Sequence, residues 1–173
     1  YRVHKNWGNL DPAKTPVKNC HEMVIDKKGR LIMVTDETKN NIIIYDRSGK
    51  LITTWGNEFP GGHGLTLSDE GDEEFLFICD PETGRVVKTT LDGQHLLELP
   101  HPRSINVYES TQAYRPTETA IGPNGDIYVA DGYGSQYILQ FNSKGEFIRK
   151  FGGPGSEDSN FSTAHGVCID ARD

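Results

Sequence analysis

Three histidines occupy equivalent positions in a repeated stretch of the sequence. His21, His63 and His165 each open a short apolar run, and Thr117 stands at the corresponding place in the remaining copy. Neutral imidazole nitrogens are common ligands of zinc. If these positions lie at one height around a common axis, the three rings can converge on a metal ion. The alternative is that each ring hydrogen-bonds neighbouring backbone and holds no metal.

A tyrosine between two glycines is the second candidate for chemistry. Tyr133 follows Asp131 and Gly132 and precedes Gly134. Such small neighbours allow the backbone to approach a ligand closely. The loop of Tyr133 could therefore lie against a ligand at the channel mouth. Tyr133 could equally be an aromatic side chain packed on the next unit of the repeat.

The repeat also indicates which elements position these residues. Each copy contains four short β-branched or aromatic segments separated by glycine, asparagine or aspartate, as expected of strands joined by tight turns. No stretch has a sustained helical period of apolar residues. Four strands in a unit of roughly 40–50 residues are typical of a β-propeller blade. We therefore predict an all-β protein, a β-propeller of four-stranded blades with the histidines at the central channel.

The copies define a single, incomplete propeller domain over residues 1–173. Asp36, Asp80 and Asp131 recur at the same place in each copy and are expected to cap turns. Extra residues in one copy fall in the loop 100–116. The expected parts are a blade-closing strand (1–8), three blades (18–56, 60–100 and 115–152) and the start of a next blade (162–173). The remaining blades of a longer chain, or a second copy, would complete the ring.

The composition argues against two classes of partner. The 18 lysines and arginines are outnumbered by 25 aspartates and glutamates, which gives a net charge of −7 and no basic face for nucleic acid. No apolar run approaches the ~20 residues of a membrane helix, so we expect no membrane insertion. Cys20, Cys79 and Cys168 have no CxxC spacing and are expected to be buried strand thiols.

The blades resemble NHL repeats, and nearly all 173 residues resemble the six-bladed propellers related to the lyase domain of peptidylglycine α-amidating enzymes. The most specific matches are the residues 131–134, the run from Phe59 to Leu65 and the run from Phe161 to Val167. The resemblance implies that His63 and His165 bind zinc. It also implies that the backbone carbonyl of Leu65 faces a structural calcium, that Tyr133 is catalytic and that the protein is extracellular or periplasmic.

Two positions depart from that family. Asp36 stands where the family has an arginine, and Gly134 stands where it often has a disulfide-bonded cysteine. An arginine that binds a substrate carboxylate cannot be replaced by a group of opposite charge. The first departure therefore counts against lyase activity.

Three functions remain open from the sequence. The favoured one is an NHL-type propeller with a metal site, zinc or calcium, and a pocket for a small molecule or peptide at the channel mouth. The second is a lyase that cleaves a carbinolamide C–N bond, with zinc polarising the substrate and Tyr133 as base. The third is a non-catalytic scaffold for a protein or glycan, in which the histidines are structural. The aligned histidines speak against the scaffold, and Asp36 speaks against the lyase.

Overall fold

The computed structural model describes residues 2–170, which form twelve β-strands and no helix. Nothing in that range could cross a bilayer as a helix. The strands are β1 (Cys20–Ile25), β2 (Leu31–Thr35), β3 (Ile42–Tyr45), β4 (Leu51–Trp55), β5 (Leu65–Asp69), β6 (Glu74–Asp80), β7 (Arg85–Thr90), β8 (His95–Glu98), β9 (Glu118–Ile121), β10 (Ile127–Ala130), β11 (Tyr137–Phe141) and β12 (Phe147–Gly152).

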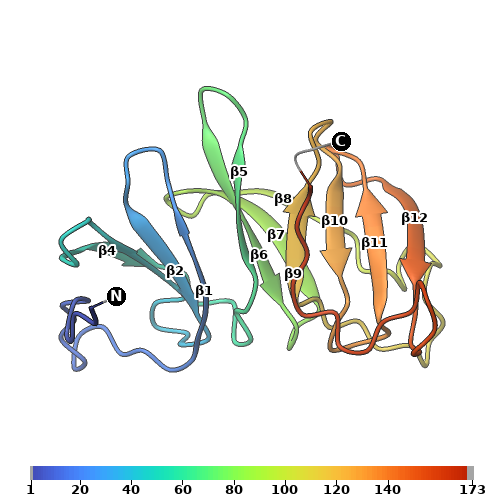
Figure 1. The fold of residues 1–173 in the computed structure, drawn as a ribbon, viewed down its shortest axis with the longest axis horizontal. Coiled ribbons are helices and arrows are strands. Elements are labelled where there is room, and N and C mark those ends of the chain that lie inside the picture. The colour runs from blue at the N-terminus through green and yellow to red at the C-terminus, as the bar shows by residue number, and fades with distance from the viewer. Residues whose placement is uncertain (1, 171–173) are drawn as a thin grey trace.

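The strands form three antiparallel sheets of four, each built from strands that follow one another in the chain. The sheets stand side by side, from β1–β4 at one end to β9–β12 at the other (Figure 1). The first strands of the sheets are neighbours, because β1 contacts β5 and β5 contacts β9. The all-β, four-stranded units expected from the repeat are confirmed. They bring His21, His63 and Thr117, the equivalent positions of the three repeats, to the starts of neighbouring strands.

The middle sheet contributes to a core on each of its faces, because successive side chains along a strand point to opposite faces of the sheet. In β6, Leu76 and Ile78 face the first sheet, whereas Phe77 and Cys79 face the third. Two cores result, one between each pair of neighbouring sheets. The first also contains Ile32, Val34, Ile42, Ile44, Phe59, Leu65 and Val87, and the second Val86, Leu99, Tyr108, Tyr114, Ile127, Val129, Leu139 and Phe141.

Some expected details differ. Residues 2–8 form no strand, and Trp7 instead packs on the ring of Tyr45, with 5.7 Å between ring centroids. Residues 162–170 form no strand either, and 171–173, like Tyr1, lie outside the described range. The expectation of three buried thiols is wrong for two of them. Cys79 is buried, but Cys20 and Cys168 are exposed, and all three are free.

Candidate functional site

A carboxylate at the same point of each blade fixes the segment that leads into the innermost strand. Asp36, Asp80 and Asp131 are the turn caps expected from the repeat. Each also accepts a hydrogen bond from a backbone N–H two positions before His21, His63 or Thr117. These pairs are Asn19 with Asp36 (2.8 Å), Gly61 with Asp80 (3.2 Å) and Arg115 with Asp131 (2.6 Å). The repeated contact places His21, His63 and Thr117 at equivalent points of the three blades.

The three histidines of the repeat form one cluster. The ring of His21 stacks on that of His63, with centroids 4.3 Å apart and an interplanar angle of 24°. The ring of His165 meets His63 at 4.8 Å and 62°. His63 is buried, with 4% of its surface exposed, whereas His21 and His165 are open to solvent. Residues more than a hundred positions apart are thus brought into contact by the blade geometry.

Tyr133 closes this cluster. Its hydroxyl oxygen lies 3.2 Å from Nε2 of His63 and 2.7 Å from Nε2 of His165. Both rings present an edge to the tyrosine ring, at 5.2 and 5.4 Å between centroids. Two imidazole nitrogens therefore converge on one phenol oxygen. Such a group can bind a metal ion or exchange a proton with a bound molecule.

The tautomer of His63 follows from its other nitrogen. Nδ1 lies 2.9 Å from the backbone carbonyl of Thr117, which can only accept a hydrogen bond, so Nδ1 carries the proton. Burial lowers the pKa of His63, and the nearby rings of His21 and His165 lower it further, against the opposing effect of the Thr117 carbonyl. The ring is therefore neutral near pH 7, with the lone pair of Nε2 directed to the cluster. This is the arrangement typical of a metal-binding histidine held by a backbone carbonyl.

The loop that carries Tyr133 is anchored on a buried carboxylate. Asp131 has no exposed surface, and its oxygens accept hydrogen bonds from the Tyr108 hydroxyl (2.8 Å) and from the backbone of Ser135 (2.7 Å). Burial raises the pKa of Asp131, and these hydrogen bonds and that from the backbone N–H of Arg115 oppose the rise. The backbone N–H of Tyr133 donates to the carbonyl of Arg115 (3.3 Å). The segment that enters β9 thus anchors the tyrosine loop at two points, Asp131 and the N–H of Tyr133.

Two further residues tie the tyrosine loop to the segment before His165, and sequence reasoning missed both. The hydroxyl of Thr117 donates to the carbonyl of Ala164 at 2.8 Å. The side-chain amide of Gln136 donates to the carbonyl of Gly132 (2.8 Å) and accepts the N–H of Thr163 (2.6 Å). Gln136 and Thr163 both have positive φ, at 63° and 61°, which is uncommon for such residues. Thr117 could have been found from its place at the position that holds a histidine in the other repeats, whereas nothing in the sequence marked Gln136.

Beside the imidazoles lies a pair of glutamates next to the predicted calcium position. Leu65 is buried, and its N–H donates to Glu22 at 3.0 Å. Glu22 is therefore half-buried and engaged in this hydrogen bond. Burial, together with the neighbouring Glu22, raises the pKa of Glu118 to about 9. The two carboxyl groups therefore titrate as a pair and carry less negative charge than two isolated glutamates.

Comparison with known proteins adds an independent line of evidence. No family model matches the chain. A probable peptidyl-α-hydroxyglycine α-amidating lyase of Caenorhabditis elegans is 28% identical over 171 residues, which cover 88% of this chain and 47% of that protein. The peptidyl-α-hydroxyglycine α-amidating lyase 1 of Drosophila melanogaster is 31% identical over 153 residues, covering 88% and 26%. The chain is related to the amidating lyases. It spans about half the length of the worm relative.

Solved structures agree on the fold. A streptogramin B lyase superimposes with a TM-score of 0.64 at 16% identity, covering 90% of this chain and 45% of that one. A Bacteroides caccae protein of unknown function gives a TM-score of 0.62 at 14% identity, covering 86% and 54%. At these identities the likeness shows the fold alone. The blades of this amidating-lyase relative are those of a β-propeller.

The two positions that depart from the amidating-lyase pattern are structural here. Asp36 accepts hydrogen bonds from the backbone and side chain of Asn19, both at 2.8 Å, and lies 3.6 Å from Nζ of Lys18. Burial raises the pKa of Asp36, but these contacts outweigh it and leave the pKa below its ordinary value. At Gly134, a Cβ atom would lie 2.1 Å from Oδ1 of Asp131. Any larger residue there would displace the carboxylate that holds the tyrosine loop.

The side chains near the imidazole cluster limit which metal sites this part of the chain offers. Within residues 2–170, no group of three or more histidine, cysteine, aspartate or glutamate side chains is arranged to hold a metal ion. The convergent donors are Nε2 of His63 and Nε2 of His165, with His21 stacked behind His63. Both imidazoles fit zinc in chemistry, and His63 also in tautomer, but two imidazoles supply only part of its coordination.

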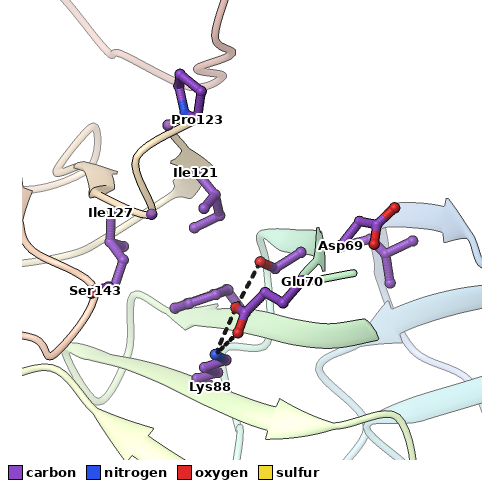
Figure 2. A pocket seen from close by; sticks show the side chains of 12 residues that line it. Asp69, Glu70, Lys88, Ile121, Pro123, Ile127 and Ser143 are labelled. Atoms are coloured by element: carbon purple, nitrogen blue, oxygen red, sulfur yellow. Dashed lines mark hydrogen bonds and ion pairs between the residues drawn. The ribbon is translucent and has the colours of Figure 1, made fainter. Parts of the chain in front are cut away.

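A groove of about 500 Å³ lies at the other end of the same strands, between the second and third sheets. Nζ of Lys88 lies 2.7 and 2.8 Å from the carboxylate oxygens of Glu70, opposite Ile121 and Ile127 (Figure 2), and Asp69 pairs with Lys27. The Lys88 ammonium also lies 4.2 Å above the ring of Phe75. Because its charges neutralise one another, this groove offers no reactive group comparable to the imidazole cluster.

Proposed function

We propose that this propeller carries the zinc and tyrosine site of a lyase that cleaves the C–N bond of N-acyl-α-hydroxyglycines. The observation that carries the proposal is the convergence of the Tyr133 hydroxyl with Nε2 of His63 and Nε2 of His165, at 3.2 and 2.7 Å. The relatives named as peptidyl-α-hydroxyglycine α-amidating lyases support it. Because the chain spans only part of those proteins, the activity of the whole protein is itself part of this proposal.

The residues present fit a zinc ion in part. His63 and His165 would hold it, with His63 oriented by the Thr117 carbonyl, and His21 stands next in the cluster. Zinc bound there would polarise the substrate hydroxyl as a Lewis acid. A second ion, calcium, would lie at the backbone carbonyl of Leu65 beside Glu22. In keeping with this chemistry, we expect an extracellular or periplasmic protein.

The chain's own contribution to the reaction is proton transfer at Tyr133. The substrate R–CO–NH–CH(OH)–COO⁻ loses its hydroxyl proton, a C=O bond forms and the C–N bond breaks. The electron pair of that bond passes to the amide nitrogen, which gains a proton, so that the products are R–CO–NH₂ and glyoxylate. Tyr133 Oη accepts the hydroxyl proton as base while its own phenolic proton passes to the amide nitrogen, so the tyrosine ends the step neutral.

A second candidate is a metal-binding propeller without lyase turnover. It is favoured by Asp36, which stands where the related lyases have an arginine and is fully engaged by Asn19 and Lys18. In that case the cluster would bind zinc and a small molecule or peptide at the channel mouth without breaking the C–N bond. The two functions differ in one measurable product.

The test is turnover of N-benzoyl-α-hydroxyglycine by the full-length protein, measured as release of glyoxylate and benzamide above the spontaneous rate. We expect both products in equal amounts, loss of the activity after treatment with a chelator, and its return with added zinc. Zinc binding without product release would contradict the lyase and support the second candidate. Turnover that survives complete metal removal would contradict both.

A further inference from the structure

A separate groove of about 570 Å³ lies between the second and third blades, next to the tyrosine loop. One wall is the turn between β6 and β7, Pro81 to Gly84. The other is the loop 100–116, the extra length of the repeat, which contributes His101, Arg103, Tyr114 and Arg115. Insertions in repeat proteins gather on one face, and that face is often the binding face.

The inserted loop is a fixed part of the structure. Tyr108 and Tyr114 are buried in the core between the second and third blades, with ring centroids 6.1 Å apart. The hydroxyl of Tyr108 donates to Asp131, the same carboxylate that anchors the tyrosine loop. Nε and Nη2 of Arg103 donate to the carbonyl of Gln112 at 3.1 and 2.5 Å. The groove is therefore built on the same support as Tyr133.

Arg115 links the groove to the candidate site through its backbone. Its N–H donates to Asp131, and its carbonyl accepts the N–H of Tyr133. Its side-chain Nε donates to the carbonyl of Pro81 at 3.2 Å, which directs the guanidinium along the groove wall. Neither Nη atom of Arg115 makes a hydrogen bond to any residue in the range 2–170. The two Nη nitrogens of this guanidinium, which carry four N–H donors, thus remain available beside the tyrosine loop.

The charge of the groove is opposite to that of the whole chain. Two guanidinium groups, Arg103 and Arg115, face one carboxylate, Glu82, whereas the chain has a net charge of −7. A net charge of about one positive unit matches a singly charged carboxylate better than a dianionic phosphate. Guanidinium groups bind carboxylates through two parallel hydrogen bonds.

We propose that this groove binds the carboxylate of an acidic ligand next to Tyr133, with Arg115 as the main contact and Arg103 as its support. This inference rests on the proposed function, because it names the acid-bearing end of the substrate of the same site.

The test compares two non-reactive probes that differ in charge: N-benzoylglycine, a carboxylate, and N-benzoylglycinamide, its neutral amide. Binding to the full-length protein is measured by calorimetry at low and moderate salt. We expect the carboxylate to bind more tightly than the amide. We expect Arg115→Gln to weaken carboxylate binding by about tenfold, the loss of a charge-assisted hydrogen bond, and to leave the amide unaffected. The variant Arg103→Gln should have a smaller effect in the same direction.

The matched control is Arg47→Gln, an exposed arginine in the turn between β3 and β4 at the opposite end of the first blade. It changes the net charge equally and should leave binding of both probes unchanged. Equal affinity for the acid and the amide, or equal losses in Arg115→Gln and Arg47→Gln, would overturn the inference. Tighter, Arg115-dependent binding of inorganic phosphate would contradict the assignment to a carboxylate.

The outcomes also separate this inference from the proposed function. Arginine-dependent binding of N-benzoylglycine without turnover of the hydroxylated substrate would keep the groove and remove the lyase. Turnover that is insensitive to Arg115→Gln in both kcat and KM would keep the lyase and remove the groove.

Discussion

Replacing Tyr133 with phenylalanine is expected to slow C–N cleavage by roughly 10²–10⁴-fold, the usual contribution of a positioned acid–base group. The change removes one oxygen, whose hydrogen-bond partners are Nε2 of His63 and Nε2 of His165. Because the tyrosine is 39% exposed, the free energy of unfolding should change by less than about 1 kcal/mol. The measurements are kcat on the hydroxylated substrate and the thermal midpoint of the same preparation.

The matched control is Tyr128→Phe, a half-buried tyrosine in β10 of the same blade. It should retain both activity and stability. The zinc content of the Tyr133→Phe variant should also be retained, since the imidazole nitrogens are unchanged. A Tyr133→Phe variant that is fully active would show that the proton moves through another group, and the proposed role of Tyr133 would be lost.

Replacing Gly132 with alanine is expected to disrupt the whole site. A Cβ atom at Gly132 would lie 1.8 Å from the carbonyl oxygen of Ala164 and 2.8 Å from Oγ1 of Thr117. The first of these is backbone and cannot rotate away, so the segment that carries His165 must move. We expect the protein to lose roughly 2–4 kcal/mol of stability, as for overpacking at a tight contact. The affinity for zinc should fall with it, because His165 no longer meets His63.

Gly166→Ala is the control for this change. It lies directly after His165, and a Cβ atom there meets nothing within 4 Å. The same substitution next to the same imidazole should therefore leave zinc affinity and the thermal midpoint unchanged. If Gly132→Ala binds zinc as tightly as Gly166→Ala, the close approach of the Ala164 segment does not position His165.

The blade architecture and the approach of His21 to His63 could be predicted because both are consequences of the repeat. A strand pattern that recurs places equivalent residues at equivalent heights, so His21 and His63 meet at the edges of neighbouring sheets, and His165 continues the pattern in a segment without a strand. The recurring aspartates strengthen this equivalence, since each fixes the backbone two residues before His21, His63 or Thr117.

The contacts that tie one blade to the next could not be predicted in this way. The bonds from Thr117 to Ala164 and from Gln136 to Thr163 join segments outside the repeated strands, where the pattern gives no register. The raised pKa of Glu118 depends on burial beside Glu22, nearly a hundred residues away. The exposure of Cys20 likewise depends on what packs beside β1, which an apolar sequence context does not specify.

The most direct test of the central claim is X-ray absorption at the zinc edge on the full-length protein, as purified and after zinc is added to the metal-free form. Imidazole nitrogens at about 2.0–2.1 Å should dominate the first shell. His165→Ala should remove one nitrogen and weaken zinc binding, whereas His4→Ala, at an exposed position outside the histidine register, should change neither. A zinc shell that is unaffected by His165→Ala, or a folded protein that takes up no zinc, would contradict the account.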